Sequence, residues 1–134
     1  MFLGLSIHPV LVAIVLGSAF AISRAMGLPI HSQEMIIAAA ISLAAAELAM
    51  IPLFLSRHAS QDVMSQAALM TTGLHMLLAA GAGGFVSFKL IPGQLFLYWM
   101  CGFYWVTLMS VAYVSVRAIR KAPIAPANQR PTAV

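Results

Sequence analysis

The sequence from Val63 to Phe88 reads VMSQAALMTTGLHMLLAAGAGGFVSF and contains no Asp, Glu, Lys or Arg. An α-helix needs about 20 mostly apolar residues to cross the hydrocarbon layer of a membrane, so this stretch is long enough to span it. Three similar stretches accompany it, Met1–Ser23, Leu90–Val116 and Met35–Ser56, the last interrupted only by Glu47. We therefore predict four transmembrane helices, at residues 5–24, 35–56, 64–88 and 93–117.

The composition agrees with a membrane protein and excludes several other classes. Of the 134 residues, 62% are apolar and 7% are charged, against roughly half and a quarter in soluble domains. A soluble chain of this size leaves about 40% of its unfolded surface in water and could not hide so much apolar area. A soluble enzyme and a disordered chain are excluded, and the single Cys101 excludes a disulfide scaffold.

The predicted connections are short and rich in residues that end helices. The first contains Gly27 and Pro29, the second covers residues 57–62, and the third contains Pro92. Short connections make consecutive helices antiparallel neighbours, so we expect an all-α polytopic membrane protein of two antiparallel hairpins. Residues 1–117 form this transmembrane domain, and residues 118–134, which are basic and Pro-rich, are predicted to be a disordered cytoplasmic tail.

The net charge of +4 arises mainly from loops and the C-terminal tail, which favours a role in orientation over nucleic-acid binding. Five of the seven Lys and Arg residues lie in the second connection and the tail, and Arg24 and Lys89 lie in the other two connections. The larger group is expected to face the cytoplasm. We predict an integral protein of the bacterial inner membrane with both termini cytoplasmic. No Lys or Arg precedes the first apolar stretch, so we expect a retained helix and not a cleaved signal peptide.

Glu47 lies near the middle of the second predicted span, where an acid costs about 3 kcal/mol. If spans two and three are antiparallel, the depths of Glu47 and His75 differ by only about 4–5 Å at 1.5 Å rise per residue. The two residues are therefore a candidate intramembrane polar pair. Three interpretations remain open: a structural hydrogen bond with a neutral Glu47, a pair that handles protons or cations, and contact with another subunit.

The sequence contains no recognisable catalytic, cofactor or metal site. The other histidines are His8, near the start of span one, and His31 and His58, in connections on opposite sides of the membrane. This placement predicts no partner for His75 in a bis-histidine haem site. There is no cluster of metal ligands and no Ser/His/Asp arrangement, and Ser and Thr in such helices routinely bond to their own backbone carbonyls. We predict neither enzyme activity nor a cofactor.

Small residues recur at helical spacing where close helix packing is expected. The candidate packing residues are Ala38, Ser42, Ala45, Ala46, Ala49, Gly81 and Gly84. They either pack within the bundle or dock onto the transmembrane helices of a partner. A second open question concerns Phe103, Tyr104 and Trp105, which lie deep in span four and either face lipid or stack on a partner or pigment.

The layout of two hairpins in a short chain resembles the ATP synthase protein I family, as does the run Ala38–Arg57. That run is a small-residue helix with an embedded Glu47, followed by Ile51-Pro52-Leu53-Phe54-Leu55-Ser56-Arg57. Where many family members have an acidic residue followed by Lys in the third helix, this chain has Gly73-Leu74-His75-Met76. The resemblance implies an accessory role in assembling the proteolipid ring of the rotary ATP synthase.

Three functions follow from these observations. The first is an accessory or assembly protein of a larger membrane complex, in contact with lipid and with other transmembrane subunits. The second is a small oligomeric transporter of protons or cations that uses Glu47. The third is a membrane-anchor subunit of a redox complex, in which His75 and the aromatic residues of span four contact a quinone or haem held with another chain.

Overall fold

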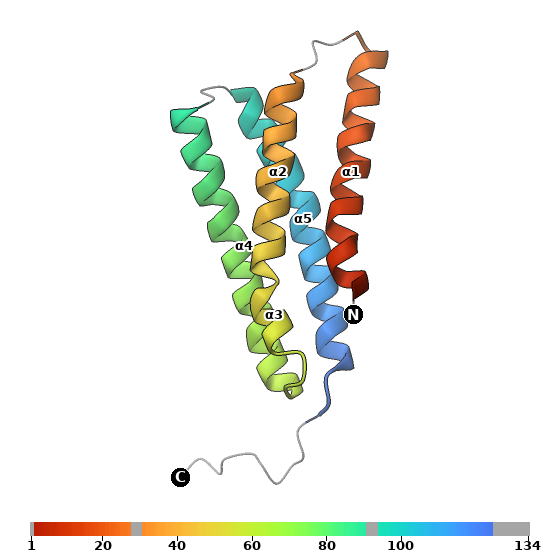
Figure 1. The fold of residues 1–134 in the computed structure, drawn as a ribbon, viewed down its shortest axis with the longest axis vertical. Helices are drawn as coiled ribbons and strands as arrows, with labels where there is room; N and C mark the ends of the chain where they lie inside the picture. The colour runs from red at the N-terminus through yellow and green to blue at the C-terminus, as the bar shows by residue number, and fades with distance from the viewer. Residues whose placement is uncertain (1, 28–30, 91–93, 125–134) are drawn as a thin grey trace.

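The computed structural model describes residues 2–27, 31–90 and 94–124, with side chains from His8 onward. The described chain is helical apart from short turns. Its helices are α1 (Phe2–Ala25), α2 (Ser32–Ala49), α3 (Ile51–Leu55), α4 (Gln61–Lys89) and α5 (Gln94–Lys121). Figure 1 shows the long helices side by side in one bundle, each antiparallel to the next along the chain.

The prediction of an all-helical membrane protein with four spans is confirmed. The described residues contain four helical segments long and apolar enough to cross a membrane, which are His8–Ala25, Ser32–Leu55, Gln61–Lys89 and Gln94–Lys121. Such segments suit a bilayer because a helix satisfies its own backbone hydrogen bonds where no water is present. The protein is thus a small four-helix integral membrane protein.

The second span is divided into α2 and α3 at Met50. Pro52 has no backbone N–H to donate, and its ring crowds the preceding turn, so the helix cannot pass through this point with regular hydrogen bonds. Met50 keeps helical dihedral angles (φ −72°, ψ −10°), and its N–H still reaches the carbonyls of Ala46 and Glu47 at 3.2 Å. The interruption therefore bends the span without ending it, one turn after Glu47.

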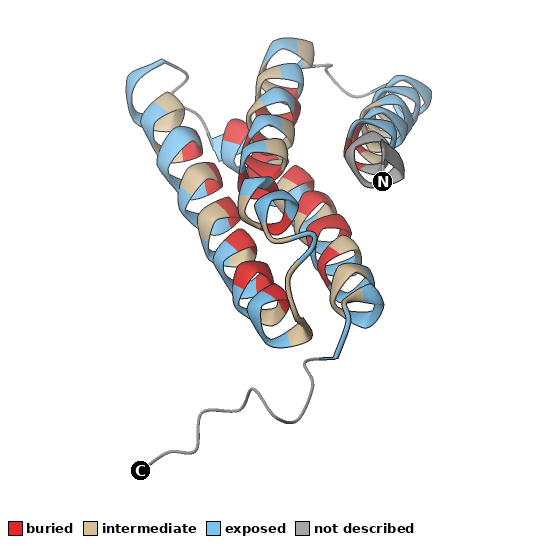
Figure 2. Ribbon diagram, turned by 60° about the horizontal axis from the view of Figure 1, so that its bottom comes forward, coloured by how far each residue is buried: buried red, intermediate tan, exposed pale blue. Residues whose placement is uncertain are grey.

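The helices are not equally buried. The contacts place α5 against α1, α2 and α4, and α2 likewise touches α1 and α4. Figure 2 shows buried residues concentrated where α2, α4 and α5 face one another, while α1 stands at the side of this group and is mostly exposed. Helices α2 and α5 therefore each contact every other long helix of the bundle.

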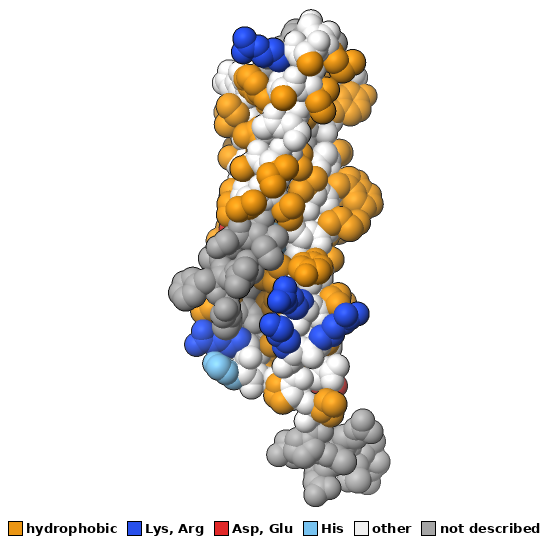
Figure 3. Space-filling view, turned by 90° about the vertical axis from the view of Figure 1, so that its right-hand side faces the viewer, with side chains coloured by type: hydrophobic (Ala, Val, Ile, Leu, Met, Phe, Trp, Pro, Cys, Tyr) orange, Lys and Arg blue, Asp and Glu red, His pale blue; other side chains and the backbone are white. Residues whose placement is uncertain are grey.

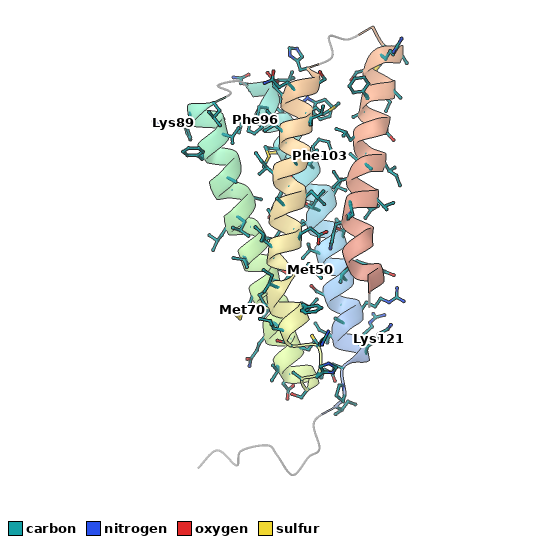
Figure 4. The ribbon with its side chains drawn as sticks, viewed as in Figure 1. Met50, Met70, Lys89, Phe96, Phe103 and Lys121 are labelled. Atoms are coloured by element: carbon teal, nitrogen blue, oxygen red, sulfur yellow. The ribbon has the colours of Figure 1, made fainter. Side chains whose placement is uncertain are left out.

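Two apolar layers fill the bundle at different depths. The first apolar layer lies toward the end of the bundle marked by Lys89 and consists of Val12, Met35, Ala38, Ala39, Phe96, Met100 and Phe103. The second apolar layer lies toward the Lys121 end and consists of Ala46, Met50, Leu53, Met64, Ala67, Ala68 and Val111. Figure 4 shows Phe96 and Phe103 in the first layer and Met50 in the second.

On the face shown in Figure 3, the Lys and Arg side chains lie toward the two ends of the bundle, and many apolar side chains lie between them. Helix α5 continues through Lys121, so residues 118–121 are helical although we expected the tail to begin there. Basic residues in a last helical turn are stabilised by the helix dipole, which supports this extension beyond the apolar span. Residues 122–124 follow the helix without regular secondary structure, and residues 125–134, the remainder of the predicted tail, lie outside the described residues.

A backbone hydrogen bond connects the segment that follows α5 to the start of α4. The backbone N–H of Gln61, at the first position of α4, donates a hydrogen bond of 3.0 Å to the carbonyl of Pro123. The first N–H groups of a helix have no partner inside it. The segment after α5 therefore supplies one of the acceptors that α4 lacks.

Gly83 offers a test of how tightly α4 and α5 pack. A Cβ atom at this position would lie 2.7 Å from Cε of Met100, so Gly83→Val should push the terminal methyl group of Met100 aside. Because the end of a methionine side chain can move at modest cost, we expect a loss in the free energy of unfolding in detergent micelles at the lower end of the 1–3 kcal/mol range, about 1 kcal/mol. Gly81→Val is the matched control, because a Cβ there meets nothing within 4 Å. Equal losses in both variants would contradict this packing.

Candidate functional site

Four buried polar side chains from three helices meet between the two apolar layers. They are His8 of α1, His75 of α4, and Thr107 and Ser110 of α5, and we call them the polar quartet. Both imidazoles are fully buried, and Thr107 and Ser110 are 1% and 4% exposed. Nδ1 of His8 lies 2.6 Å from Oγ of Ser110, and Nε2 of His75 lies 3.2 Å from Oγ1 of Thr107. One turn of α5 thus connects both histidines.

The fold explains why these residues meet. Thr107 and Ser110 are three residues apart and so lie on the same face of α5. Because α5 is antiparallel to α4, His75 and Thr107 lie about equally far from the turn between Lys89 and Gln94. On α5, Phe103 of the first layer precedes Thr107 by one turn, and Val111 of the second layer follows Ser110. The quartet is therefore enclosed by apolar side chains above and below.

Each hydroxyl of the quartet also bonds to the backbone of α5. Thr107 Oγ1 donates to the carbonyl of Phe103 at 2.9 Å, and Ser110 Oγ donates to the carbonyl of Thr107 at 2.8 Å. This is the behaviour expected of Ser and Thr in membrane helices. Each hydroxyl therefore contacts an imidazole on one side and a backbone carbonyl of its own helix on the other.

Tyr104 completes the surroundings of His75. The rings of His75 and Tyr104 are stacked, with centroids 5.2 Å apart and planes within 6° of parallel. Tyr104 is half-buried and Trp105 is exposed, whereas Phe103 is 1% exposed and belongs to the first apolar layer. Of the three deep aromatic residues of span four, only Trp105 therefore fits the expectation of a ring that faces lipid, because a helix turns Phe103 and Tyr104 toward its neighbours.

Glu47 and His75 occupy different surroundings. His75 is fully buried, and Glu47 on α2 is half-buried with its Oε1 atom enclosed and without a hydrogen-bond partner. No hydrogen bond between these two side chains is found among the described residues; the partner of His75 is Thr107. Residue counting places two side chains at similar depth but says nothing of how each helix is rotated, and this rotation decides which side chains face each other.

Sequence reasoning missed His8, Thr107 and Ser110. We considered His8 only as a second haem ligand beside His75 and set it aside because it is near the start of α1; in the structure, the two histidines contact Ser110 and Thr107, three positions apart on α5. His8 lies near the start of α1 and Ser110 in the second half of α5. Because α1 and α5 are antiparallel, the two residues lie at similar depth in the bundle. The sequence signal that could have revealed this site is the pair of hydroxyl residues Thr107 and Ser110, three positions apart in span four.

The candidate packing residues divide into two groups. Those of α2 are all buried within the bundle, at Ala38, Ser42, Ala45, Ala46 and Ala49. Ser42 also approaches the sulfur of Met100, with Oγ 3.9 Å from Sδ. Gly81, in contrast, is exposed and Gly84 is half-exposed on α4. The α2 stripe is therefore used in internal packing, and only the glycines of α4 lie at the surface.

Two apolar grooves run along α5. The α4–α5 groove has a volume of about 320 Å³ and is lined by Met76, Ala79, Ala80, Gly83, Gly84, Leu97, Met100, Cys101 and Tyr104. The α1–α5 groove has a volume of about 440 Å³ and is lined by Leu11, Trp105, Val106, Met109, Ser110 and Tyr113. The α4–α5 groove is lined by Tyr104, which is stacked on His75. The α1–α5 groove is lined by Ser110, which contacts His8.

Within residues 8–27, 31–90 and 94–124, no group of three or more His, Cys, Asp or Glu side chains is placed to hold a metal ion. Cys101 is exposed and free, at the edge of the α4–α5 groove.

Comparisons of the chain with protein-family models, with curated proteins and with solved structures found no match.

Thr107→Val tests whether the quartet stabilises the bundle. The substitution keeps the shape of the side chain but leaves the buried ring nitrogen Nε2 of His75 without its partner. We expect a loss of about 1–2 kcal/mol in the free energy of unfolding, measured in mixed micelles. Thr107→Ser retains the hydroxyl and loses only a methyl group, so it should lose less stability than Thr107→Val. Wild-type stability of Thr107→Val, which keeps the methyl and loses only the hydroxyl, would contradict a stabilising role for this hydrogen bond.

Proposed function

We propose that this protein is an accessory subunit that helps a larger membrane complex to assemble, and that it binds a transmembrane helix of that complex in the α4–α5 groove. The observation that carries the proposal is the groove itself. It is apolar, it opens on the outer surface of the bundle, and Ala80 and Gly84 line it one turn apart on α4.

Small residues at this spacing favour helix association in membranes. Lipid tails are as apolar as leucine, so helices associate through close backbone contact, and Ala or Gly side chains permit it. The comparable stripe on α2 is already covered by neighbouring helices. The α4–α5 groove is therefore a place where the backbone of α4 remains open to a further helix, next to a second helix that forms the other wall.

The complex that we propose is the rotary ATP synthase. This choice rests on the resemblance of the two-hairpin layout and of the run Ala38–Arg57 to the ATP synthase protein I family. Under this proposal the groove accepts a helix of the proteolipid ring or of a neighbouring subunit during assembly. The transporter that uses Glu47 and the redox-complex anchor are the competing functions, and the experiment below separates them.

We further propose that the protein lies in the bacterial inner membrane with both ends in the cytoplasm. Arg57 follows α3, and Arg117, Arg120 and Lys121 lie at the end of α5, so these four cations share one end of the bundle. Only Arg24 and Lys89 lie at the other end. The more basic end of a small membrane protein usually faces the cytoplasm.

Reporter fusions test this orientation. A reporter active only in the cytoplasm should be active after Val134 and silent when inserted between Pro29 and Gln33, and a reporter active only in the periplasm should give the reverse. The physical reason is the four-to-two distribution of cations on the described ends. Periplasmic activity at the C-terminus would contradict the proposed orientation.

Gly84→Leu tests the proposed function. A side chain at Gly84 meets nothing within 4 Å, so leucine should fill the groove without disturbing the fold. We expect the wild-type protein, solubilised gently, to migrate with the ATP synthase on native gels, and Gly84→Leu to lose most of this association, about tenfold for a loss of 1.4 kcal/mol. Gly73→Leu, also in open space on α4 but outside the groove, should associate like wild type.

Cys101 provides a second measurement, because it is the only cysteine and lies at the groove. An apolar maleimide should label it more slowly in the intact complex than after the complex is dissociated. Migration with a respiratory complex would favour the redox anchor. A free monomer or homo-oligomer with normal synthase levels in the deletion strain, and Glu47-dependent ion movement in liposomes, would favour the transporter.

A further inference from the structure

The α1–α5 groove differs from the α4–α5 groove in the size of the side chains that line it. It has a volume of about 440 Å³, and Trp105, Met109 and Tyr113 are each more than half exposed along it. Ser110 is the small residue of this lining, and it is only 4% exposed. Helices associate closely in membranes through small residues at their surfaces, and the described lining offers none. The groove therefore suits a flexible apolar chain better than a further helix.

Basic side chains continue the line of the groove along α5. Tyr113, Arg117 and Arg120 follow one another at intervals of four and three residues, so they lie on one face of the helix. Met109 precedes Tyr113 by one turn on this face, and Lys121 follows Arg117 by one turn. The three cations are exposed, and Figure 3 shows Lys and Arg side chains gathered toward the lower end of the face that it draws. The groove thus leads toward a group of cations.

These cations lie at the depth of lipid headgroups. No charged residue occurs between Leu90 and Val116, and Arg117 is the first one after this apolar run. At 1.5 Å rise per residue, Arg117 is about 6 Å beyond Tyr113 along the helix axis. Tyrosine rings are enriched at the boundary between the hydrocarbon and the headgroups. The groove therefore lies at the level of acyl chains, and the cations that follow it lie at the level of phosphates.

The positive charge at this end of the bundle is not balanced by acids. Asp62, in the first turn of α4, is the one Asp or Glu of the sequence that lies at this end. Arg57 also lies here, but its guanidinium carbon is 4.8 Å from the centroid of the Phe54 ring, and α3 packs against α4 and α2. The cations that extend the groove are therefore those of α5. The fork of an arginine side chain can donate two parallel hydrogen bonds to a phosphate.

We propose that an anionic phospholipid binds at this place, with an acyl chain in the α1–α5 groove and its phosphate at Arg117 and Arg120. The acyl chain covers Trp105, Met109 and Tyr113, and the two guanidinium groups donate hydrogen bonds to the phosphate oxygens. A zwitterionic phospholipid fills the groove equally well, but its ammonium group offsets the negative charge that basic residues attract. Selectivity for the anionic headgroup therefore separates this site from ordinary contact with lipid. The site is independent of the accessory role and of the orientation proposed above.

Quenching of Trp105 fluorescence by brominated lipid tests the proposal in the full-length protein. Trp99→Phe leaves Trp105 as the only tryptophan. This variant is reconstituted in phosphatidylcholine vesicles in which a small fraction of the lipid is phosphatidylglycerol, or phosphatidylcholine, with bromine on its acyl chains. We expect stronger quenching by the brominated phosphatidylglycerol, because the site concentrates it beside Trp105. Unlabelled phosphatidylglycerol should remove the difference, and unlabelled phosphatidylcholine should not.

Single substitutions in the Trp99→Phe protein locate the headgroup. Arg117→Gln and Arg120→Gln should each lower the preference for phosphatidylglycerol about fivefold, the loss expected for one basic contact with an anionic headgroup. Arg117→Lys keeps the charge and should retain most of the preference. Arg57→Gln is the matched control, because it removes one charge at the same end of the bundle but outside the groove, and its preference should be unchanged. Quenching by brominated phosphatidylcholine should be the same in every variant, which shows that the fold is intact.

Four results would overturn the proposal. Equal quenching by the two brominated lipids would show that the site does not select a headgroup. An equal loss of preference in Arg57→Gln would reduce the effect to attraction by the overall charge. Relief of the excess quenching by inorganic phosphate at constant ionic strength would assign the cations to a free anion. Failure of both lipids to quench Trp105 would show that a second copy of the chain covers the groove.

Discussion

The hydrocarbon interior of a membrane contains no water to satisfy polar groups, and this constraint governs the placement of every polar side chain in the bundle. Several hydroxyls meet it by bonding to their own helices, whereas those of Thr71 and Ser115 are buried without a hydrogen-bond partner. Thr72 donates to the carbonyl of Ala68, and Ser65 to that of Gln61. Thr107 and Ser110 follow the same rule, and because their oxygens can still accept, they bind the two imidazoles as well.

Helix α5 is the element on which this arrangement depends. Its inner face presents Phe96, Phe103, Thr107, Ser110 and Val111, so it contributes to both apolar layers and to the polar quartet between them. Its flanks form one wall of each groove. A change on α5 would therefore reach both histidines and the proposed docking surface, whereas a change on α1 would reach only His8 and one groove.

Counting residues along the sequence predicted the features that depend only on the lengths of the apolar stretches and on the positions of the charges. The four spans are confirmed, and Ala38, Ala46 and Ala49 are completely buried. Counting gives the depth of a residue but not the rotation of its helix, which depends on how several side chains pack at once. For this reason the contact expected between Glu47 and His75 is not formed as a hydrogen bond, and the partners of His75 and His8 on α5 were not foreseen.

The bond between Gln61 and Pro123 has a mechanical consequence. Pro123, which follows α5, lies next to the first turn of α4, the helix that carries His75 and Gly84. A load applied to the chain at Pro123, for example by a bound protein in the aqueous phase, would be transmitted to α4 and α5 at this contact before it reached α1. Movement at that contact would shift the two walls of the α4–α5 groove relative to each other.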